Sequence, residues 1–263
     1  MAMTDEDFLD NVDRIIDAGG TVTDEYTRLK GRLSAFHSLE NASLALLKQA
    51  VASDVPMDRV AELRSLSYAE LATPPEQAVV RNAVRGELIR LLRVEYAQTA
   101  EGNYEGVGLR FNDTASRYTD AHHTVPASTD PATLVSATAK VRNAWTEGQA
   151  LAVELTALAD LLVVAASLTG RQVGSKGARV GLTVLGAGLH RRELWDAYDA
   201  GWSAVLDLGA ELHAPDLEQF EALAEPRAIE TRYVQGDMGM RAVEWDPEDE
   251  HTAEEEAQHF TLT

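Results

Sequence analysis

The sequence predicts a mainly α protein: an elongated helical bundle with long helices, followed by a small C-terminal β-hairpin arm and an acidic tail. Two observations predict this class. Apolar residues recur every three or four positions through most of the first 226 residues, between clear capping and breaking signals. After Pro226 apolar and polar residues alternate, which is the period of a β-strand. We therefore divide the chain into four regions: an N-terminal helical region (1–100), an irregular connection (101–129), a C-terminal helical region (130–226), and the hairpin arm with the tail (227–263).

The first region opens with two helices that have clear start signals. Thr4 and Asp7 stand at the spacing of a capping box, and they predict a helix over 4–18. Thr23 is the expected cap of a second, long amphipathic helix that reaches residue 51. A shorter helix is expected to follow and to end near residue 66.

A fourth helix begins at the segment Thr73-Pro74-Pro75-Glu76, where a cap residue precedes a proline at the first helical position. We expect it to run to residue 98. Beyond it the helical pattern breaks down over 101–126, and 104–111 reads as a short strand. The apolar residues that we expect this helix to bury are Val80, Val84, Leu88 and Leu91.

The second helical region begins with the same combination of cap and proline at Asp130-Pro131, and it predicts one helix over 130–168. Glu154 and Asp160 make this apolar segment a buried helix and not a membrane span. A further helix is expected over 189–212, and Pro215 starts a last short one. The segment 180–185 stays open between strand and helix.

The C-terminal region predicts a β-hairpin over 229–245, with a turn at 236–239. A lone two-stranded hairpin is marginally stable in water. We therefore expect it to lie on its own bundle or on a neighbouring subunit. The following residues, 246–258, are almost wholly acidic.

The charge of the chain indicates where the protein works. It has 43 Asp and Glu against 23 Lys and Arg, for a formal net charge of −20. This surplus is typical of proteins in molar salt, where the Debye length falls to about 3 Å and repulsion is screened. We expect a high-salt cytoplasm or a virion, with no signal peptide at the N-terminus. The absence of cysteine excludes disulfides and thiolate chemistry.

No catalytic, cofactor-binding or metal-binding residue can be assigned from the sequence. Gly186-Ala187-Gly188 lacks the third glycine of a dinucleotide-binding turn, because Arg191 stands there. Ser175-Lys176-Gly177 has the wrong order for a phosphate loop. The pairs His122-His123 and Glu255/His259, and the group Glu211, His213 and Asp216, lack the spacing of a complete metal site.

We expect a non-enzymatic structural or assembly subunit of a homo-oligomer. Its most concrete form is a head-tail connector or adaptor in the virion of a tailed virus of a halophile. Two alternatives stay open: a cellular regulatory or adaptor protein of a halophile, and an enzyme with a nucleotide or metal site near the glycine-rich segment 170–188. No sequence-specific nucleic-acid binding and no membrane partner are expected, because the basic residues are dispersed in an acidic chain.

The expected interface combines aromatic and apolar residues of the last two regions. Two tryptophans stand seven residues apart on one predicted helix face, where core packing is the default interpretation and an interface is the alternative. The others lie on the predicted hairpin. The expected interface residues are Trp195, Trp202, Tyr233, Met240 and Trp245.

The charge surplus predicts that the fold depends on salt. Lowering potassium chloride from 3 M to 0.1 M restores repulsion among the excess carboxylates, so helicity and melting temperature should both fall. Circular dichroism across that range measures both quantities. If helicity and melting temperature stay constant across that range, the negative charge is not an adaptation to high salt.

Overall fold

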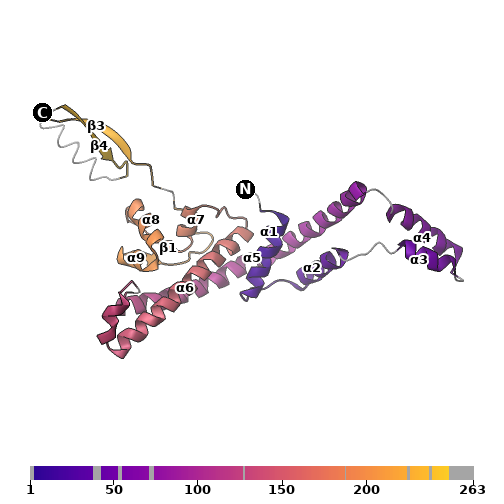
Figure 1. Ribbon diagram of the computed structural model, residues 1–263, viewed down its shortest axis with the longest axis horizontal. Coiled ribbons are helices and arrows are strands. Elements are labelled where there is room, and N and C mark those ends of the chain that lie inside the picture. Colours follow the sequence, from indigo (N-terminus) through magenta and orange to yellow (C-terminus); the bar gives the residue numbers. More distant parts are fainter. Residues whose placement is uncertain are drawn as a thin grey trace. The chain divides into compact units, whose positions relative to one another are not determined.

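The computed structural model describes residues 3–37, 43–52, 55–70, 74–126, 128–186, 188–223, 226–236 and 239–248. The protein is mainly α with long helices and carries small antiparallel two-stranded sheets near its C-terminal end, as predicted (Figure 1). The chain divides into two compact units, Met1–Ala100 and Glu101–Thr263. The boundary between them falls inside one helix, α5.

The described elements of the first unit are all helices. The second unit contains the rest of α5, a 3-10 helix η1, further helices and four short strands. In order, the elements are α1 (Asp5–Asp17), α2 (Asp24–His37), α3 (Ser43–Val51), α4 (Met57–Glu70), α5 (Pro74–Thr124), η1 (Pro131–Ser136), α6 (Ala139–Leu168), α7 (Lys176–Gly181), β1 (Val184–Leu185), α8 (Arg191–Ala200), α9 (Trp202–Asp207), β2 (Glu211–Leu212), β3 (Glu230–Gly236) and β4 (Gly239–Trp245).

The capping box at the start of α1 is confirmed. The Thr4 hydroxyl accepts the N–H of Asp7 at 3.1 Å, and the Asp7 carboxylate accepts the N–H of Thr4 at 3.3 Å. Thr23 caps α2 by accepting the N–H of Tyr26 at 3.0 Å. The long helix predicted from Thr23 to residue 51 is helical over α2 and α3. The junction between these two helices lies outside the described residues.

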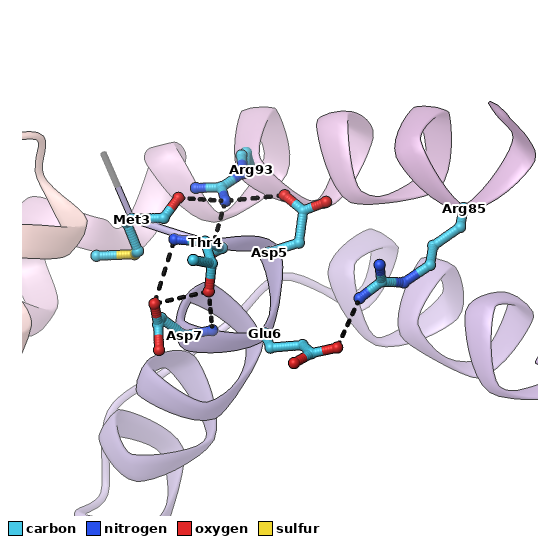
Figure 2. A network of polar contacts seen from close by, with 7 residues as sticks. All are labelled: Met3, Thr4, Asp5, Glu6, Asp7, Arg85 and Arg93. Carbon is cyan, nitrogen blue, oxygen red and sulfur yellow. Dashed lines mark hydrogen bonds and ion pairs between the residues drawn. The ribbon is translucent and has the colours of Figure 1, made fainter. Parts of the chain in front are cut away.

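Arg93 of α5 holds the first turn of α1 (Figure 2). Its Nη2 donates to the carbonyl oxygens of Met3 and Thr4 at 3.4 and 3.1 Å, and to the Asp5 carboxylate at 3.1 Å. The same guanidinium lies 4.4 Å from the centre of the Phe8 ring. Asp5 offsets the repulsion between this cation and the positive end of the α1 dipole. One side chain thus fixes both the backbone and the apolar face of α1.

The predictions of an irregular connection over 101–129 and of a short strand within it are wrong, because α5 continues to Thr124. Most of its buried residues repeat at intervals of three, four and four, and Tyr104, Ala115 and Ala121 are buried beside them. This buried stripe of α5 is Ile89, Leu92, Tyr96, Ala100, Asn103, Val107, Phe111, Thr114, Tyr118, His122 and Val125. Packing of the stripe outweighs the low helix propensity of the glycines at 102, 106 and 108.

The prediction of which face of α5 is buried is also wrong. Val84 is 37% exposed, and Leu88 and Leu91 are only partly buried, while Ile89 and Leu92 are fully buried. The side chain of Val80 lies outside the described ones. The predicted face is offset by one residue from the buried one, since Ile89 and Leu92 directly follow Leu88 and Leu91 in the sequence.

The helix expected over 130–168 is interrupted. Asp130 caps the short 3-10 helix η1, and Thr138 then caps α6 by accepting the N–H of Val141 at 3.4 Å. The second cap ends the first element because Thr138 has extended backbone angles. By length and composition α6 alone among the described helices qualifies as a membrane span. Its buried face includes Leu155 and Leu162, which accounts for its apolar character in a core.

Three other expectations change in the second unit. The segment 180–185 ends a helix at Gly181 and then forms β1, which pairs with β2. The helix expected over 189–212 is broken at Gly201, whose φ of +114° lies in the region that glycine favours. No helix follows Pro215 among the described residues. Instead, the segment forms a turn, in which the Asp216 carboxylate accepts the N–H groups of Glu218 and Gln219.

The hairpin is confirmed. Strands β3 and β4 pair in antiparallel register, with Glu230 opposite Trp245 and Gly236 opposite Gly239. The two residues of the turn, and the acidic tail from residue 249, lie outside the described residues.

The Arg93 network predicts a specific loss of stability. Arg93→Ala removes three hydrogen bonds and the contact with Phe8, and should lower the free energy of unfolding by about 1–3 kcal/mol. Arg90→Ala is the matched control, because Arg90 makes an exposed pair with Glu87 one turn away, and such a pair contributes little to the free energy of unfolding. Urea denaturation at constant high salt compares the two. Equal effects would contradict the anchoring role of Arg93.

Candidate functional site

The base of the hairpin arm is fixed by a cluster of charged residues that we name the arm clamp: Arg191, Arg192, Arg227, Asp246 and Glu248. Arg192 Nε lies 2.6 Å from Asp246 Oδ2, and Arg192 Nη2 donates to the carbonyl oxygen of Arg227 at 2.7 Å. Arg191 pairs with both carboxylate oxygens of Glu248. The N–H of Arg227 donates to Glu248 at 3.0 Å. The clamp therefore joins both ends of the hairpin to the start of α8.

The carboxylates of the clamp are shielded from solvent. The side chains of Glu248 and Asp246 are 10% and 15% exposed. Salt screens such buried pairs less than surface pairs. The hydrogen bond from Arg192 holds the pKa of Asp246 below its ordinary value. Since the pKa is lowered in the fold, this stabilisation is present at neutral pH and is lost as the pH falls through the folded-state pKa.

The two faces of the hairpin differ in exposure. The register places Arg232, Val234, Val243 and Trp245 on one face, where they are partly buried, together with the exposed Glu230 and Arg241. The guanidinium of Arg232 lies over the Trp245 ring. The opposite face, which we name the Tyr233 face, is exposed along its whole length. It consists of Thr231, Tyr233, Gln235, Met240, Ala242 and Glu244.

The Tyr233 face is apolar at its centre and open at its edges. Tyr233 is 68% exposed and Met240 is 63% exposed. Tyr233 is paired with Ala242, and Met240 with Gln235, so the two large side chains are diagonal neighbours. Within the described residues no third strand pairs with β3 or β4. Each strand therefore presents an edge of backbone donors and acceptors.

The expected interface residues divide into two groups. Tyr233, Met240 and Trp245 lie on the hairpin, with Trp245 on the face opposite the other two. Trp195 is buried in α8 beneath Lys176 Nζ, which lies 4.5 Å from its ring centre. Trp202 lies in α9, donates its Nε1–H to Thr156 at 3.0 Å, and packs edge-on against Phe111. Both tryptophans thus have packing partners inside the second unit.

The glycines of the segment 170–188 allow close packing. A Cβ on Gly177 would lie 1.8 Å from the carbonyl oxygen of Leu223, and one on Gly181 would lie 2.3 Å from that of Glu221. The N–H of Leu223 donates to the Gly177 carbonyl at 2.9 Å. A Cβ on Gly186 would meet Leu194 at 2.3 Å. These contacts explain three of the six glycines of the segment, Gly177, Gly181 and Gly186, whereas a Cβ on Gly170, Gly174 or Gly188 would meet no atom within 4 Å.

The basic residues around these glycines are ion-paired. Lys176 lies 2.5 Å from the Asp199 carboxylate, and Arg179 lies 2.8 Å from that of Asp160. Ser175 caps α7 by accepting the N–H of Ala178. The side chains that resemble a phosphate loop in sequence are therefore engaged with carboxylates and with the helix cap.

A polar cluster that the sequence did not reveal lies between α5 and α9. His122 Nε2 is 3.1 Å from Asp207 Oδ1, and the Ser203 hydroxyl is 3.4 Å from His122 Nδ1 and 3.3 Å from the Ser128 hydroxyl. These residue types are those of a nucleophile, a base and an orienting acid. These contacts connect α9 to the C-terminal part of α5 and to the loop that holds Ser128.

The remaining candidates yield no assembled site among the described residues. No group of three or more His, Cys, Asp or Glu side chains there is arranged to hold a metal ion. The pair Glu255/His259 lies outside the described residues. The residues of the arm clamp were also missed, although the Asp246-Pro247 turn signal could have indicated a fixed turn after β4.

Searches of family models, curated proteins and solved structures found no match to this chain.

The close approach at Gly177 predicts a destabilising substitution. Gly177→Ala places a Cβ against the Leu223 backbone, and it should cost about 1–3 kcal/mol despite the better helix propensity of alanine. Gly174→Ala is the control, since a Cβ there meets no atom within 4 Å. Chemical denaturation measures both variants. A neutral Gly177 variant would contradict the packing role and leave the glycine-rich segment without an explanation.

Proposed function

We propose that this protein is a non-enzymatic assembly subunit that forms a homo-oligomer at high salt through its C-terminal arm. The observation that carries the proposal is the Tyr233 face: an exposed apolar surface on a two-stranded hairpin whose edges are open and whose base is fixed. A strand of another subunit can add to such an edge through backbone hydrogen bonds, while alternate side chains supply the apolar contact.

The charge of the arm supports contact between copies. Residues 227–245 contain three arginines and three carboxylates, so their formal net charge is zero in a chain of −20. Two such hairpins meet without the repulsion that opposes contact between acidic surfaces. The arm clamp supports the proposal as well, because a fixed base lowers the entropy lost when the arm is immobilised by a neighbour.

The proposal has a narrower form, in which the oligomer is a closed ring such as a head-tail connector of a virus that infects a halophile. A heterologous contact, in which the arm of one copy binds a different surface of the next, generates a ring when its rotation closes. Negative-stain electron microscopy distinguishes this form. Closed rings favour it, whereas dimers or open filaments exclude it.

The oligomer should depend on the Tyr233 face. The double variant Tyr233→Thr/Met240→Thr keeps good strand formers but removes the apolar contact, so light scattering after size exclusion in 2–3 M potassium chloride should give a lower molar mass. Helicity should be unchanged. Leu109→Gln is the control, because Leu109 is 72% exposed on α5, outside the arm, and its substitution should leave the mass unaltered. An unaltered mass of the double variant would refute assembly through the arm.

A further inference from the structure

The α3–α4 pair has a small core of its own. The two helices pack together around the buried residues Ala50, Val60 and Leu63, with Leu47 and Val55 partly buried beside them. The short connection makes the helices antiparallel neighbours. The pair belongs to the first compact unit, Met1–Ala100, but its own core is small. Small cores of this kind are commonly completed by oligomerisation or another staple.

One face of this pair is hollow. Leu46, Gln49, Ala50, Val55, Arg59 and Leu63 line an open pocket of about 220 Å³. A cavity of about 150 Å³ is large enough for benzene, so the pocket has room for one large apolar side chain. Leu66 stands seven residues after Arg59, two helical turns further along the same stripe of α4. We name this surface, with Leu46 and Leu66 at 46% and 43% exposure, the pocket face.

The pocket face thus combines a cavity and a projecting leucine on one helical pair. A surface with both is self-complementary, because a two-fold axis brings the projection of each copy to the cavity of the other. The charge permits this contact. Residues 43–70 contain three basic and four acidic residues, which gives a net charge of −1 in a chain of −20. An isologous contact therefore brings together two nearly neutral surfaces.

We propose that the pocket face is a second self-association surface, on which the α3–α4 pair of another copy packs to form an antiparallel four-helix bundle. In this bundle Leu66 of each copy enters the pocket of its partner. Such packing is the ordinary way in which helical pairs complete a core. The proposal does not depend on the arm, and it gives the subunit two distinct contacts with other copies.

The test uses the full chain in 3 M potassium chloride, with Tyr233→Thr/Met240→Thr as the background that removes the arm contact. Sedimentation equilibrium should find this background variant as a dimer of the 28.6 kDa chain. Adding Leu46→Ser/Leu66→Ser should weaken dimerisation at least tenfold. Adding Val51→Ser/Met57→Ser is the control. These residues are more exposed, at 67% and 75%, but lie on the opposite flank of the pair, so the dimer should persist.

The outcomes separate the two proposals. A background variant that is monomeric throughout, or an equal loss of dimer in the control, overturns the pocket face as a contact. If the arm substitutions leave the original oligomer intact, assembly through the arm fails. The Leu46/Leu66 substitutions then decide the pocket face alone: a lower mass supports it and an unchanged mass overturns it. Because the chain has no cysteine, a nitroxide on Arg64→Cys, an exposed position of α4 outside the pocket lining, provides a second measurement, in which a defined dipolar distance supports the bundle and its absence overturns it.

Discussion

The buried stripe of α5 is the constraint on which both units depend. In the first unit, Phe8 of α1 and Tyr26 of α2 each contact the ring of Tyr96. In the second unit, Phe111 of the stripe packs against Trp202, and Tyr104 beside the stripe donates its hydroxyl to the Pro215 carbonyl at 2.7 Å. A repeat of eleven residues has 3.67 residues per turn, close to the 3.6 of a straight helix. One helix face therefore stays available for packing throughout, without a strong supercoil.

The parts of the fold that the sequence predicts correctly are those with local signals. Thr4 and Asp7 are three residues apart, and the alternation of the hairpin is contained within 229–245. The second half of α5 lacks such a signal, because buried polar residues interrupt its apolar pattern. Thr114 is one of them, and its hydroxyl lies 3.3 Å from Glu154, forty residues away in sequence. The break at Gly201 was missed for the opposite reason, since the apolar spacing continues across it.

In the candidate site, too, the features with a local sequence signal were predictable and the long-range contacts were not. The alternation of the hairpin led us to expect Tyr233, Met240 and Trp245 at an interface, which stays a prediction; Tyr233 and Met240 are exposed, whereas Trp245 is partly buried. The arm clamp was not predictable in this way, because Arg191 and Glu248 are 57 residues apart and single-sequence periodicity carries no information on such a pair. Burial also gives the clamp a different dependence on salt from exposed pairs such as Arg28 and Glu25, which are about half exposed. The attachment of the arm should therefore be less sensitive to ionic strength than the rest of the charged surface.

The tyrosines that pack the core also set an alkaline limit to the fold. Burial raises the pKa of Tyr104 to about 12, and it raises the pKa of Tyr26, Tyr118 and Tyr198 as well. A phenol whose pKa is higher in the folded state keeps its full stabilising contribution below the unfolded value near 10, and it loses that contribution as the pH rises through the folded value. Several such groups lose their protons together when the chain unfolds. Alkaline unfolding should therefore be steep in pH, and tyrosinate absorbance would report it without any added label.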